Sequence, residues 1–153
     1  MLVFEETIIS SVNEDIESMQ YLIDILIREQ EALLNDSLNQ IELLTPIKSD
    51  IIHGLSKSND VRMSAFLSFN KTESFIVWLE KHNDPVLVVA WAELMSLTCK
   101  AKEFNSINSL LLNQLAVRNQ GYLSFFKGDN QEKTLYGRDG FNCYKSKGLS
   151  FKG

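Results

Sequence analysis

The stretch DPVLVVAWAELMSLTCKAKEFNSINSLLLNQLAVRNQGYLSFF, residues 84–126, carries the longest regular pattern in the chain. Steps of three and four residues separate its repeating positions, as on one face of a helix. Asp84 and Pro85 form a strong start signal, because the carboxylate caps free amides and proline suits the first helical position. The pattern predicts one very long helix whose seam contains Leu87, Trp91, Leu94, Thr98, Ala101, Asn105, Asn108, Leu112, Leu115, Asn119, Tyr122 and Phe126.

A similar seam opens the chain and predicts a helix over residues 5–34. The polar residues Asn35 and Asp36 supply a turn, and Ser37 with Gln40 forms a capping-box pattern for the next helix. Because the turn is short, this second helix is expected to run antiparallel to the first. Pro46 predicts a kink or a restart near Thr45, since an interior proline removes an amide donor and clashes with the preceding turn.

A short third helix is expected to open at about residues 70–72 and to end at about residues 82–83. We therefore predict an all-α fold, an elongated antiparallel bundle with a long helical hairpin, a short third helix and a very long fourth helix. Five of the seven glycines lie in residues 127–153. The composition thus predicts a helical domain over residues 1–126 and an irregular basic C-terminal tail over residues 127–153.

Charge follows the same division. Residues 1–126 hold 9 Lys and Arg against 17 Asp and Glu, whereas the tail holds 6 against 3. Because phosphate binding needs placed cations, the acidic body argues against nucleic acid as a partner. The dense acids of the first helix are interpreted as a solvated face, and the alternative is that they steer a basic partner.

The motif search favours a binding protein over an enzyme. Phosphate-binding glycine loops, nucleophile elbows and zinc-protease helices are all absent as sequence motifs. Asp50 and His53 form half of a carboxylate-histidine metal motif, so we predict no metal, no cofactor and no catalytic residue. Cys99 and Cys143 are interpreted as free thiols, which fits a reducing compartment.

The N-terminus carries Glu5 and Glu6 where a signal peptide is basic. No apolar run reaches the length of about 18 residues that a membrane span needs. These features predict a cytosolic protein with no direct insertion into a membrane.

Asparagines in the long seam have two interpretations. Asn105, Asn108 and Asn119 could set the register of packed helices or lie where the seam is exposed, because a desolvated amide needs a partner. Alternatively, the face that carries them is shared with a partner chain. An over-long amphipathic helix with an uncovered seam would favour such a partner.

Several of these features together resemble the FlgN family of flagellar type III export chaperones. They are the acidic helical hairpin, Trp91, the Asn-x-x-Asn pair in FNSINSLL (residues 104–111) and TLYGRDG (residues 134–140). The resemblance implies a cytosolic chaperone that binds the hook-filament junction proteins FlgK and FlgL and prevents their premature assembly. It also implies delivery of these proteins to the export-gate component FlhA. Serine follows Asn108 where the family often has glycine.

The resemblance also implies where the two partners bind. Junction proteins would contact the C-terminal part of the long seam, and FlhA would dock onto the tail motif. The corresponding substrate-binding residues are Asn105, Asn108, Leu111, Leu112, Leu115, Asn119 and Tyr122, and the gate-docking residues are Leu135, Tyr136, Gly137 and Gly140. The alternative function is a structural coiled-coil adaptor whose seam makes a homo-oligomer, and a homodimer is compatible with either function.

Overall fold

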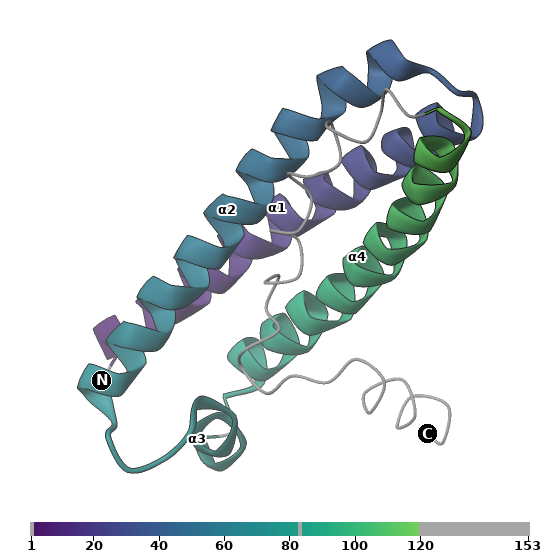
Figure 1. Cartoon of the computed structure of the whole chain (residues 1–153). Coiled ribbons are helices and arrows are strands. Elements are labelled where there is room, and N and C mark those ends of the chain that lie inside the picture. Colours follow the sequence, from purple (N-terminus) through teal and green to yellow (C-terminus); the bar gives the residue numbers. More distant parts are fainter. Residues whose placement is uncertain (1, 83, 120–153) are drawn as a thin grey trace, which may run out of the picture.

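The computed structural model describes residues 2–82 and 84–119 of the 153-residue chain. These residues form four helices and no strand: α1 (Leu2–Leu34), α2 (Leu38–Phe69), α3 (Phe75–His82) and α4 (Pro85–Arg118). The three long helices lie along one another, and α3 lies at the end of the bundle where α1 begins (Figure 1). Because α1 packs against both α2 and α4, it is the central helix. The prediction of an all-α helical bundle is confirmed.

The turn between α1 and α2 differs from the predicted capping box. The amide of Ser37 donates to Ala32 O at 2.9 Å, and the amide of Asp36 donates to Leu33 O at 3.4 Å. Asp36 has a φ of 51°, a left-handed conformation that aspartate tolerates better than most residues. This arrangement is a Schellman closure, which satisfies the last carbonyls of α1. Ser37 precedes α2, but its side chain makes no capping hydrogen bond.

Pro46 does not restart α2, so of the two outcomes predicted near Thr45, a kink or a restart, the restart is wrong. The helix continues from Leu38 to Phe69 with the proline inside it. Its buried side is continuous, with Ile41 and Leu44 before the proline and Lys48 and Ile52 after it. Burial of one large aliphatic side chain contributes about 1.5–3 kcal/mol, so several together outweigh a proline cost of about 3 kcal/mol.

The predicted start of α4 is confirmed. Asp84 is the N-cap, its carboxylate accepts a hydrogen bond from the amide of Val86 at 3.0 Å, and Pro85 occupies the first turn. The end of α4 differs from the prediction, since the helix stops at Arg118 rather than near residue 126. Asn119 follows in extended backbone, and its amide donates to Leu115 O. The boundary predicted at residues 126–127 and the whole tail lie outside the described residues.

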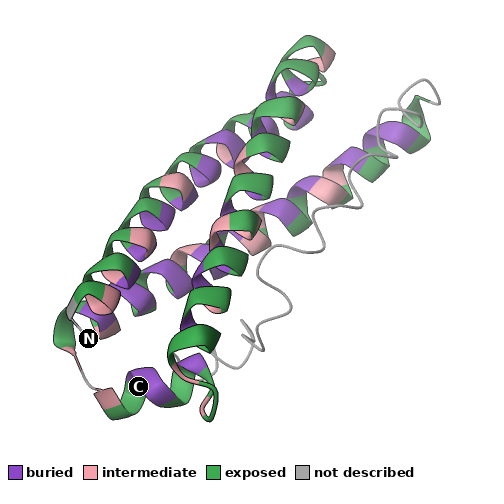
Figure 2. Cartoon of the chain, turned by 90° about the vertical axis from the view of Figure 1, so that its left-hand side faces the viewer, coloured by how far each residue is buried: buried purple, intermediate pink, exposed green. Residues whose placement is uncertain are grey.

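Buried residues form one stripe along each long helix, and the stripes face one another (Figure 2). The larger apolar cluster extends from the α3 end of the bundle along much of its length and takes residues from all four helices. Its buried aromatic residues are Phe66, Phe75, Trp78 and Trp91, and at their edge Phe4 stacks on the exposed Phe69. A smaller cluster near the α1–α2 turn is formed by Ala32, Leu33, Ile41, Leu112, Leu115 and Ala116. The C-terminal half of α4 is therefore anchored by the smaller cluster.

Candidate functional site

The seam predicted on α4 is the inner face of that helix. Among the predicted substrate-binding residues, Asn105, Asn108, Leu112 and Leu115 are all buried. They lie against α1 and α2 of the same chain. An uncovered seam was the physical reason for expecting a partner there, and in the described structure the bundle itself covers these four residues.

The two buried asparagines belong to a polar network that joins all three long helices. Asn108 Nδ2 donates to Leu26 O and to Glu29 Oε1, both at 2.9 Å. Lys48 Nζ lies 2.9 Å from Glu29 Oε2 and 3.5 Å from Asn105 Oδ1. Because desolvated polar groups need their partners, a shift of one helix along another would break these contacts at a cost in stability. This geometry matches the register interpretation of Asn105 and Asn108.

A second buried ion pair lies closer to α3. Arg62 Nη1 on α2 is 2.8 Å from Asp15 Oδ2 on α1, and it also donates to Ser11 Oγ at 3.0 Å. Its Nη2 donates to Asn59 Oδ1, and its guanidinium lies 5.5 Å from the centre of a Trp91 ring. Asp15 and Glu29 are both buried, so their assignment to a solvated acidic face is wrong.

A spacing signal in the sequence could have revealed both ion pairs. Asp15 and Glu29 are fourteen residues apart on α1, and Lys48 and Arg62 are fourteen apart on α2. In an antiparallel pair, equal spacing brings each acid opposite one base. Leu22 and Leu55 lie midway in the two segments and are both buried. The heptad repeat thus contains matched opposite charges at two levels of the core.

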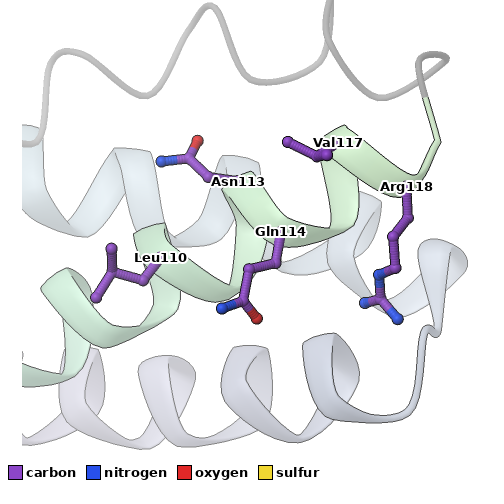
Figure 3. Close-up of a pocket in the computed structure, with 5 residues that line it drawn as sticks. All are labelled: Leu110, Asn113, Gln114, Val117 and Arg118. Carbon is purple, nitrogen blue, oxygen red and sulfur yellow. The ribbon is translucent and has the colours of Figure 1, made fainter.

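The outer face of the same part of α4 presents apolar side chains to solvent. Leu110 is 64% exposed and Val117 is 83% exposed, and Ile107 lies one turn before Leu110. A pocket there is lined by Leu110, Asn113, Gln114, Val117 and Arg118, whose side chains project from α4 (Figure 3). All five lining residues belong to α4, so they cover only one side of the pocket. A bound partner would have to supply the opposite side. We name Ile107, Leu110 and Val117 the outer face.

Of the remaining predicted site residues, two lie within the described structure and the others lie outside it. Leu111 is half-buried at the edge of the smaller cluster, and Asn119 is exposed beyond the end of α4. Tyr122 and all four gate-docking residues, Leu135, Tyr136, Gly137 and Gly140, lie outside the described residues. Sequence reasoning missed the outer face because it followed the inner seam, although the spacing of Ile107, Leu110 and Val117 also fits one side of a helix.

The expectation of free thiols is wrong for Cys99. This residue is buried on α4 and is disulfide-bonded, and the described part of the chain contains no free cysteine. Cys143 lies outside the described residues. The finding removes one of the sequence reasons for expecting a reducing compartment.

Two other sequence observations can be placed. Asp50 and His53 are exposed on α2, in agreement with their interpretation as surface residues. Across the described ranges, none of the helices combines the length and apolar composition that crossing a membrane requires.

Comparisons with known proteins identify the family. The family model described as FlgN protein matches residues 1–142. The Flagella synthesis protein FlgN of Proteus mirabilis is 26% identical over 137 residues, which cover 88% of this chain and 89% of that protein. No solved structure matches the chain significantly. With a family match that extends over most of its length and an all-helical fold, this chain belongs to the FlgN family.

Proposed function

We propose that this chain is a cytosolic export chaperone for the hook-filament junction proteins FlgK and FlgL. In this proposal it prevents their premature assembly and delivers them to the export-gate component FlhA. Family membership supports the flagellar role. The observation that supports substrate binding is the outer face, because Leu110 and Val117 are exposed and line a pocket on α4, and such a surface can dock an amphipathic helix.

The substrate-binding residues fall into two roles in this proposal. Leu111, Asn119 and Tyr122 contact the substrate together with the outer face. Asn105, Asn108, Leu112 and Leu115 hold α4 in position from its buried side. This division follows from burial, since a covered side chain can reach a partner only if α4 separates from α1.

The outer face can be tested with a matched pair of variants. Leu110→Ser with Val117→Ser should weaken binding of the C-terminal segments of FlgK and FlgL by about tenfold or more, because two apolar contacts are removed. Val86→Ser with Val89→Ser is the control, since these valines are similarly exposed at the other end of α4. Calorimetry with each purified segment measures the affinities. Equal affinities for the first variant and the unchanged chain, or an equal loss in the control, would exclude the outer face.

A truncation tests the separation of substrate binding from gate docking. A chain ending after Gly128 keeps the whole described bundle, so it should bind the junction proteins but lose affinity for FlhA. Tyr136→Ala in the full chain should reproduce the loss of FlhA binding alone. Pull-down with the purified cytosolic domain of FlhA measures the second interaction. Loss of both activities on truncation would show that the two sites are not separate.

The structural adaptor remains the alternative, and one observation counts against it. Leu112 and Leu115, through which its seam was expected to associate, are buried within a single chain. Light scattering over a wide range of concentrations distinguishes the two functions. A dimer that persists on dilution and does not bind the junction proteins would favour the adaptor.

A further inference from the structure

Three side chains that can bind a metal meet at the end of the bundle where α1 begins. Glu5 comes from the first turns of α1, His82 from the last residue of α3, and Asp84 from the N-cap of α4. One ligand atom of each lies within 4.8 Å of the other two, and all three residues are half-buried. His82 Nε2 is 3.0 Å from Glu5 Oε1. We propose that these residues form a binding site for a divalent transition-metal ion such as Zn²⁺.

The surrounding residues hold the three ligands in place. The imidazole of His82 stacks on Trp78, with ring centres 5.0 Å apart and planes 9° apart. Trp78 also packs edge-on against Phe4, the residue before Glu5. The carboxylate of Asp84 is oriented by the amide of Val86, which donates to Oδ1 and leaves Oδ2 available. Such supporting contacts reduce the ordering that metal binding requires.

The donor set determines the class of ion. One imidazole nitrogen with two carboxylate oxygens suits zinc and neighbouring first-row metals, whereas Ca²⁺ and Mg²⁺ prefer oxygen ligands alone. Zinc bonds of about 2.0–2.2 Å in a tetrahedron place ligand atoms about 3.3–3.6 Å apart. His82 Nε2 lies 3.0 Å from Glu5 Oε1, and the ligand atoms of all three residues lie within 4.8 Å of one another. Small side-chain rotations would therefore bring the three ligand atoms to the separations that zinc requires.

A bound ion would link three segments of the chain. The start of α1 is far in sequence from the α3–α4 connection, and an ion held by Glu5, His82 and Asp84 would join them directly. Metal binding to the folded state alone raises stability, so the ion would stabilise the α3 end of the bundle. Two carboxylates balance its charge, and a fourth position remains for water. The site is independent of the chaperone function proposed above.

Calorimetric titration of the full chain, after treatment with a chelator, tests the proposal. Zn²⁺ should bind at one site per chain and raise the melting temperature, whereas Mg²⁺ at the same concentration should do neither. Asp84→Asn is the main variant, because asparagine caps a helix as well as aspartate but is a poorer metal ligand. Asp84→Asn and His82→Gln should each lower the affinity for Zn²⁺ at least about tenfold.

The controls use the exposed pair on α2. Asp50→Asn and His53→Gln should leave the affinity for Zn²⁺ unchanged. Bound Co²⁺ should show visible bands without the near-ultraviolet charge-transfer band that a cysteine thiolate gives. The proposal is overturned if Zn²⁺ does not bind, if Asp84→Asn and His82→Gln bind it as tightly as the unchanged chain, or if Co²⁺ shows the thiolate band. The first result would leave only the contact between His82 Nε2 and Glu5 Oε1.

Discussion

The two faces of the C-terminal half of α4 differ in whether other helices of the chain cover their side chains. The inner face carries Asn105, Asn108, Leu112 and Leu115, all buried against α1 and α2. The outer face carries Ile107, Leu110 and Val117, which remain exposed without a partner among the described residues. Polar residues are thus buried and apolar residues exposed within the same few turns. The inner face determines how the bundle aligns, and the outer face is the surface left for another molecule.

The largest effect is expected at the centre of the inner polar network. Glu29→Ala should lower the free energy of unfolding by about 3–5 kcal/mol, because it leaves the Lys48 ammonium buried without the Glu29 carboxylate. Urea denaturation followed by circular dichroism measures the change. Glu31→Ala is the control, since this neighbouring acid is exposed on α1, and its effect should stay within about 0.5 kcal/mol.

A double variant checks the cause of that loss. Replacing Glu29 and Lys48 together by methionine removes both charges, so most of the lost stability should return. If the double variant is as unstable as Glu29→Ala, the ion pair makes a net contribution to stability, and the cost of Glu29→Ala is not only that of a buried unpaired ammonium.

The same leucine-to-alanine substitution, made once on each face of α4, should have different effects on the free energy of unfolding. Leu112→Ala should lower the free energy of unfolding by about 2–4 kcal/mol, because it opens a cavity beside Leu33 and Ile41. Leu110→Ala, two residues earlier on the exposed side, should change it by no more than about 0.5 kcal/mol. Alanine favours helix at least as well as leucine, so helix propensity does not confound the pair. Equal losses in urea denaturation would contradict the assignment of inner and outer faces.

Local sequence patterns predicted most of the fold. The seam of α4 was predicted correctly from Leu87 to Leu115, and Asp84 with Pro85 begins that helix as expected. These features depend on contacts within a few residues, and the sequence displays them directly. A helix restart at Pro46 and the capping box at Ser37 were predicted wrongly, because tertiary packing and an alternative turn outweigh those local signals.

The sequence predicted the candidate site less well than the fold. A helical period shows that one face is suited to burial, but it does not show whether the cover comes from the same chain or from a partner. Glu29 and Lys48 illustrate the same limit, since each alone reads as an ordinary surface charge until α1 and α2 are aligned.

The sequence by itself therefore determined the helical class, the start of α4 and the composition of its inner seam. Only the tertiary structure decided that α1 and α2 cover the seam, that two ion pairs are buried and that Leu110 and Val117 stay exposed. The physical reason is that helix formation depends on neighbours in sequence, whereas burial depends on which distant helices meet.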